Sequence, residues 1–183
     1  MKYNDVLPEC YIDTMLIGTL LNADVNHKYG CNEIAKDMKK GRHKDDFAIG
    51  IIDNDKRTPP YADDFDEVGK TENMIILKHK KKHQYMIKIG QEHKAIETFI
   101  KANVEAIGMT MEKFDLPSDL DALTDITKNS ITTRKDPRIL KVCKAIQASP
   151  EVARLKDVLD YLISKKYTVD VNVLKEKINQ EIV

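Results

Sequence analysis

The chain has 183 residues, of which 42% are hydrophobic and 33% are charged, and its formal net charge is +0. This length and composition predict one globular domain, or one domain with an appendage, and exclude a chain-wide basic excess for binding nucleic acid. Three cysteines without CxxC spacing and the absence of a roughly 20-residue apolar stretch exclude a disulfide framework and a membrane span, so we expect a cytoplasmic protein with reduced thiols.

Taken in chain order, the first half alternates short apolar runs with runs of helical periodicity. Strands are predicted at residues 6–10, 24–27 and 47–52, and helices at about 11–22 and 33–40. Pro8 indicates that the first strand lies at a sheet edge or ends there. Right-handed crossovers between such units make the three strands parallel.

The second half begins with two more predicted strands and continues with helices alone. The strands are expected at residues 73–78 and 84–90, and the helices at about 92–108, 119–127, 136–147, 150–165 and 170–182. The acidic residues 62–67 are expected to form a solvated loop, with metal binding as the alternative. We therefore predict an α/β fold: a mostly parallel central sheet flanked by helices over residues 1–108, with a helical region packed on it over residues 109–183.

Acidic side chains follow two of the predicted parallel strands. Asp53 and Asp55 come directly after the apolar run at residues 47–52, Glu9 closes the first strand, and Asp13 lies in the first turn of the next helix. Open α/β sheets place their chemistry at the carboxyl ends of strands, so these acids are expected to share one edge. A divalent ion with oxygen ligands would offset their repulsion. The simpler alternatives are an Asp-rich turn for residues 53–55 and a helix-dipole role for Asp13.

Two motifs in this pattern resemble the TOPRIM family, the fold shared by topoisomerases, bacterial primases and nucleases of the overcoming-lysogenization-defect type. Residues 9–13 (ECYID) resemble the primase-like EGYMD motif, with Cys10 in place of glycine, and residues 53–55 (DND) match the family's DxD. The resemblance covers roughly residues 1–100. It implies a TOPRIM-like sheet, and Mg²⁺ or Mn²⁺ held by Glu9, Asp13, Asp53 and Asp55, with Glu9 also acting as general acid or base.

The resemblance also suggests supporting residues outside the two motifs. The nuclease branch uses a later acid and a lysine, for which Glu97 and Lys128 are the loosest counterparts, and Lys56 adjoins the DxD motif as a catalytic candidate. Candidate nucleic-acid contacts are Arg57 and the lysines of the KHKKKH run, Lys78, Lys80, Lys81 and Lys82. That run is equally interpretable as a hairpin tip whose lysines discourage edge aggregation.

Several functions remain open on these observations. One is a Mg²⁺-dependent nuclease or related phosphotransferase acting on nucleic acid, of the kind found in bacterial defence. Another is a non-catalytic TOPRIM-like module that binds metal, nucleic acid or a partner protein, which Pro8, Cys10 and the helical tail favour. A third is a phosphoacceptor or nucleotide-binding domain, in which an acidic pocket binds Mg²⁺ and Lys78 is the lysine of that pocket. In the simplest interpretation the acids only cap turns. The C-terminal helices allow a homodimer contact.

Overall fold

A five-stranded sheet forms the centre of the molecule, in a computed structural model that describes residues 1–55, 58–128 and 135–180. The strand order is β2 (Val6–Pro8), β4 (Ala48–Asp53), β7 (Gln84–Ile89), β6 (Met74–His79) and β5 (Phe65–Lys70). Strand β4 pairs in parallel with β2 and β7, whereas β6 is antiparallel to both β7 and β5. A smaller parallel pair joins β1 (Lys2–Tyr3) to β3 (Asp24–Val25).

The sheet is therefore mixed, and the prediction of a mostly parallel sheet is corrected in this respect. The reason is local: only four residues separate β6 from β7 and three separate β5 from β6, and such short connections join antiparallel strands. The parallel pairing of β2 with β4 needs a long crossover, which α1 (Tyr11–Leu21), β3 and α2 (Cys31–Lys40) provide.

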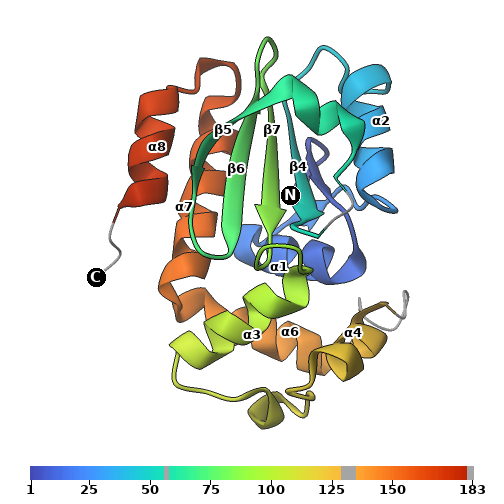
Figure 1. Cartoon of the computed structure of the whole chain (residues 1–183), viewed down its shortest axis with the longest axis vertical. Coiled ribbons are helices and arrows are strands. Elements are labelled where there is room, and N and C mark those ends of the chain that lie inside the picture. The colour runs from blue at the N-terminus through green and yellow to red at the C-terminus, as the bar shows by residue number, and fades with distance from the viewer. Residues whose placement is uncertain (56–57, 129–134, 181–183) are drawn as a thin grey trace.

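The two faces of the sheet are buried by different helices. Helix α2 and the short helix η1 (Pro60–Asp64) cover one face, and α1, α7 (Pro150–Lys165) and α8 (Val171–Asn179) cover the other (Figure 1). Side chains alternate accordingly, so that Ile49 and Ile51 face α1 whereas Ala48 and Ile52 face α2. The run 48–52 is apolar throughout because the strand is buried on both sides.

The remaining helices lie beyond the end of the sheet at which β4 and β7 finish. They are α3 (Ile96–Ala106), η2 (Met111–Phe114), α4 (Leu120–Lys128), α6 (Pro137–Ala145) and η3 (Ile146–Ala148) (Figure 1). A separate short helix, η4 (Lys166–Thr168), links α7 to α8. Helix α6 packs on α1, and side chains from these helices share one apolar cluster with the sheet. Helix α7 begins as its sequence predicts, with Ser149 as N-cap and Pro150 in the first position.

The expectation of a solvated acidic loop at residues 62–67 is wrong about the loop and right about solvation, because all four acids of the segment are exposed. The segment completes η1 and begins the edge strand β5, in which Phe65 and Val68 are buried while Asp66 and Glu67 face solvent. The helix predicted from residue 92 begins only at Ile96, because His93 adopts φ +62° and the Lys94 N–H closes a turn on the Gln91 carbonyl at 2.9 Å. The short elements β1 and η2 carried no sequence signal.

Candidate functional site

Glu9 and Asp53 lie side by side at the carboxyl edge of the parallel strands. The backbone N–H of Glu9 donates to the Ile51 carbonyl at 2.9 Å, which continues the pairing of β2 with β4. The Glu9 carboxylate then accepts a 3.0 Å hydrogen bond from the backbone N–H of Asp53. The two strands thus bring Glu9 onto the DxD segment, as the parallel-strand argument predicts.

The Asp53 carboxylate points toward the start of α3. Its Oδ1 accepts a hydrogen bond, 3.0 Å long, from the backbone N–H of Ile96. Ile96 is the first residue of that helix. The adjacent Glu97 is buried and accepts a bond from the Thr127 hydroxyl of α4. Burial, and then the charges of Glu9, Glu97 and Asp55, raise the pKa of Asp53 to about 7, although the Ile96 N–H opposes this.

Asp13 is fully buried behind this edge. Its Oδ2 accepts a 3.1 Å bond from the Cys10 backbone N–H, and the Cys10 sulfur accepts from the Asp13 N–H at 3.5 Å, so the two residues cap α1 reciprocally. Burial and the charge of Asp53 raise the pKa of Asp13 well above its ordinary range. We call Glu9, Asp13, Asp53, Asp55 and Glu97 the carboxylate cluster.

Asp55 opens from the cluster toward a hollow of about 530 Å³ on the β6–β7 side. Asn54 between the two aspartates is anchored, because its backbone N–H donates to Ile89 at 2.9 Å and its amide to the Gly90 carbonyl at 3.2 Å. Lys70 and Lys88 line the same hollow as Asp55, together with His93, Glu72 and Glu92. Among the described residues, these two lysines share a hollow with Asp55.

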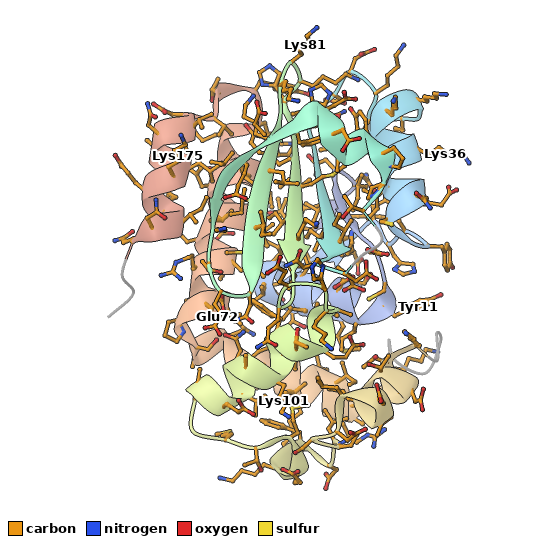
Figure 2. The ribbon with its side chains drawn as sticks, in the orientation of Figure 1. Tyr11, Lys36, Glu72, Lys81, Lys101 and Lys175 are labelled. Atoms are coloured by element: carbon orange, nitrogen blue, oxygen red, sulfur yellow. The ribbon has the colours of Figure 1, made fainter. Side chains whose placement is uncertain are left out.

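The lysines of the KHKKKH run lie elsewhere. They occupy the end of β6 and the β6–β7 turn, and Figure 2 shows Lys81 at the tip of that hairpin, far from Tyr11 beside the cluster. Lys78 donates to the His79 carbonyl, Lys80 to the Asp63 carbonyl, and Lys82 to the Lys44 carbonyl. The structure therefore does not bring Lys78, Lys80, Lys81 and Lys82 to the carboxylate cluster.

The other candidate cations are placed less closely or not described. Lys128 is exposed at the end of α4, one residue after the Thr127 that contacts Glu97. Lys56 and Arg57 lie outside the described residues. The sequence analysis did not single out Lys70 or Lys88. For Lys88 a signal was available, because it is the single charged residue within the buried run of β7 and lies two positions before Gly90.

The carboxylate cluster offers a donor set of a kind that suits a hard divalent ion. One oxygen each of Asp13 and Glu97 is buried and makes no hydrogen bond to any described residue. Across residues 1–55, 58–128 and 135–180, however, no three His, Cys, Asp or Glu side chains are arranged around one ion position. Because Mg²⁺ takes one or two carboxylates and keeps several waters, an oxygen-only edge with few direct ligands fits that ion better than zinc.

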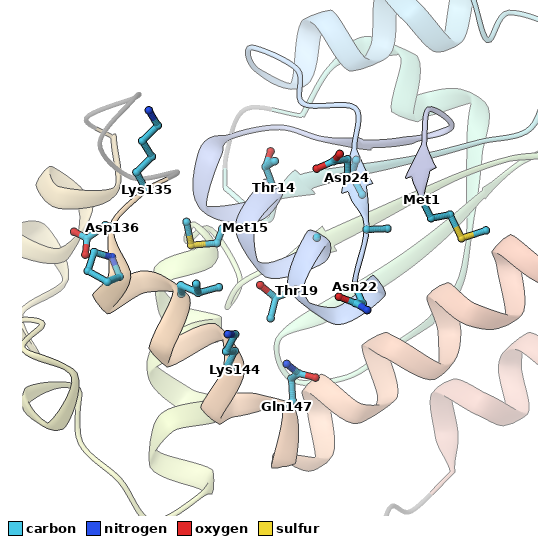
Figure 3. A pocket seen from close by; sticks show the side chains of 15 residues that line it. Met1, Thr14, Met15, Thr19, Asn22, Asp24, Lys135, Asp136, Lys144 and Gln147 are labelled. Carbon is cyan, nitrogen blue, oxygen red and sulfur yellow. The ribbon is translucent and has the colours of Figure 1, made fainter.

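A second hollow, larger than the one beside Asp55, lies between α1 and α6. It measures about 940 Å³, with Thr14, Met15 and Thr19 on one wall and Lys144 and Gln147 on the other (Figure 3). None of the carboxylate cluster lines it. Size alone does not define a reactive site, and we place the candidate chemistry at the cluster, where mutually repelling acids converge.

Comparison with known proteins does not assign a function, so the functional argument rests on the geometry of the site. No protein-family model, curated protein or solved structure matches the chain. Among the described residues no helix has both the length and the apolar character needed to cross a membrane.

Proposed function

We propose that the chain is a Mg²⁺- or Mn²⁺-dependent enzyme that cleaves or transfers nucleic-acid phosphodiesters at the carboxylate cluster. The observation that carries the proposal is the placement of Glu9 on the Asp53 backbone at the carboxyl edge of two parallel strands. The resemblance of residues 9–13 and 53–55 to the two TOPRIM motifs supports the same edge.

The residues of the carboxylate cluster and the neighbouring lysines would have different roles in this reaction. Glu9 and Asp53 would hold the ion, with Asp55 and Glu97 available to adjust the charge around it, and Glu9 is also the candidate general acid or base. When bound, the ion would supply Lewis acidity toward a phosphate oxygen and a lower pKa for water. Lys88 and Lys70 would contact neighbouring phosphates from the hollow beside Asp55.

Asp13 fits a structural role better than a direct one. Its carboxylate is committed to capping α1, and its raised pKa favours the protonated form. A protonated Asp13 lowers the negative charge of the cluster in the absence of an ion. We therefore retain Asp13 as a supporting residue in the proposal.

A thermal melt titrated with Mg²⁺ and Mn²⁺ tests metal binding directly. An ion at 100 times its Kd stabilises the folded state by about 2.7 kcal/mol, which corresponds to a Tm rise of about 5–10 °C for this size. The wild type and the exposed control Glu176→Gln should show the rise, and Asp53→Asn should not. Equal responses of wild type and Asp53→Asn would place the ion elsewhere.

Cleavage of labelled single- and double-stranded DNA and RNA tests the reaction. Glu9→Gln should lower the metal-dependent rate about a hundredfold or more while the circular dichroism spectrum stays unchanged. Unchanged cleavage in both Glu9→Gln and Asp53→Asn would overturn the proposed active site.

A non-catalytic module that binds metal, nucleic acid or a partner protein is the second candidate. The capping role of Asp13 and the lack of a three-ligand metal group among the described residues favour it. It predicts the same Tm rise with no turnover on any of the four polymers.

A further inference from the structure

Three aromatic rings gather beside the carboxylate cluster. Tyr11, the first residue of α1, stacks on His27 with ring centroids 4.2 Å apart and planes 25° from parallel. Tyr29 meets the edge of His27 at 4.8 Å, and its hydroxyl lies 3.3 Å from that of Tyr11. We call Tyr11, His27 and Tyr29 the aromatic cluster.

The aromatic cluster is fixed to the same segment that carries the acids. His27 Nδ1 lies 2.8 Å from the Thr14 hydroxyl and 3.2 Å from the Cys10 carbonyl, within the first turn of α1. The loop after Tyr29 returns to the site, because the Gly30 N–H donates to the Glu9 carbonyl at 3.2 Å. The rings therefore keep a set position relative to Glu9 and Asp13.

Packing explains Tyr11 and His27, which are both half-buried, but it does not explain Tyr29. The Tyr29 side chain is 76% exposed, so folding buries little of its ring. An exposed ring held by its neighbours offers a flat π surface to a ligand. The site next to it is proposed to act on phosphodiesters, and every nucleobase has a matching flat face.

We propose that the aromatic cluster is a stacking site for an unpaired base of single-stranded DNA or RNA whose backbone passes the carboxylate cluster. The inference rests on the proposed function and specifies its substrate class. Bases within a duplex are already stacked on both faces, whereas an unpaired base can stack on Tyr29. Stacking tolerates any base, so the site would select strandedness more than sequence.

The inference is tested by measuring the Kd for labelled 12-nucleotide oligothymidylate and oligouridylate by fluorescence anisotropy. All titrations contain Ca²⁺ and the same salt concentration. Tyr29→Ala should raise the Kd about tenfold, and Tyr29→Phe, which keeps the ring, should stay within about twofold of wild type. Tyr167→Ala is the matched control, since Tyr167 is 49% exposed but contacts His83 at the hairpin end of the sheet. An abasic strand of equal length should bind the wild type and Tyr29→Ala equally.

Each outcome bears on the inference separately from the proposed function. Wild-type binding that is unaffected by Tyr29→Ala overturns the stacking site and leaves the carboxylate cluster untouched. A tenfold loss that persists on the abasic strand also overturns it, because Tyr29 would then contact the backbone and not a base. No wild-type binding to either polymer overturns both the inference and a nucleic-acid substrate.

Discussion

At the scale of single residues, Asp53 makes the stability of the metal-free protein depend on pH. Its pKa rises from an ordinary 3.8 to about 7 in the folded state, so between those values the folded protein binds more protons than the unfolded chain. Stability must then fall as pH rises through that window. A rise of this size in the pKa corresponds to at most about 4 kcal/mol, and solvent screening reduces that value.

We predict that wild-type protein in EDTA is less stable at pH 8 than at pH 5, and that Asp53→Asn removes part of this loss. The variant should gain about 1–3 kcal/mol at pH 8, where the wild-type side chain is charged, and about a third of that at pH 5, which already lies about one unit into the window. Urea unfolding at the two pH values measures the difference, with the exposed Glu176→Gln as control. A larger gain at pH 5 than at pH 8 would contradict the assigned pKa direction.

Cys10 stands where the TOPRIM motif that residues 9–13 resemble has glycine, and its backbone needs no glycine there. The residue has φ −130° and ψ 180°, an extended conformation open to any amino acid, so the backbone does not require glycine there. Its sulfur instead caps α1 through the Asp13 N–H. A cysteine at this position therefore leaves the strand-to-helix turn unstrained.

At the scale of elements, Gly90 controls where α3 begins relative to Asp53. It follows β7 at φ +115°, and an added Cβ would lie 2.6 Å from the Ala95 carbonyl oxygen and 2.8 Å from that of Lys94. These are backbone atoms of the turn that delivers the Ile96 N–H to Asp53. A side chain at this position must therefore displace the start of the helix.

We predict that Gly90→Ala destabilises the fold by about 3 kcal/mol, from the positive φ and the backbone clash together. It should also abolish the metal-induced rise in Tm, because α3 no longer orients Asp53. Gly108→Ala is the matched control: Gly108 has φ +69° with no atom within 4 Å of the added Cβ, so only the cost of the left-handed conformation, about 1 kcal/mol, applies. Chemical denaturation with and without Mg²⁺ separates the two effects, and equal losses in both variants would refute the clash argument.

The elements that the sequence predicted well are those marked by an unbroken apolar run or by a helix cap. The apolar run of β4 and the capped helix at Pro150–Lys165 each carry a local signal that tertiary structure leaves intact. Strand β5 was missed because Asp66 and Glu67 are both exposed, beside a register shift between Glu67 and Gly69 that breaks the alternation typical of a strand. The mixed sheet follows from short connections that propensity alone does not orient.

The carboxylate cluster was only partly accessible from sequence, for a related reason. Glu9 and Asp53 meet because both follow parallel strands, which the strand–helix alternation implies. Lys88 reaches the hollow beside Asp55 only through the pairing of β7 with β4, which joins segments far apart in the sequence and leaves no local trace.

At the scale of the whole molecule, the sheet separates its two charged regions. Strand β7 runs parallel to β4, with Ile89 opposite Asp53 and Gln84 opposite Ala48. The β6–β7 turn therefore lies at the end of the sheet opposite the acids, about 20 Å away for six extended residues. A nucleic-acid backbone at the carboxylate cluster would meet Lys88 and Lys70 before it met the hairpin.

We predict that the hairpin lysines contribute little to binding at this site. Replacing Lys80, Lys81 and Lys82 together by Gln should change the Kd for a 12-nucleotide single strand less than about twofold. Replacing only Lys70 and Lys88 by Gln should weaken binding about fivefold or more, and should reduce the slope of log K against log salt by about 1 for each phosphate that a lysine no longer neutralises. The comparison is stringent because the triple variant removes more charge than the double one, so a purely charge-driven association would rank them in the opposite order. Anisotropy titrations between about 50 and about 200 mM salt measure both the Kd and the slope. If the triple variant binds more weakly than the double variant, the prediction is wrong and the nucleic acid binds at the hairpin end of the sheet.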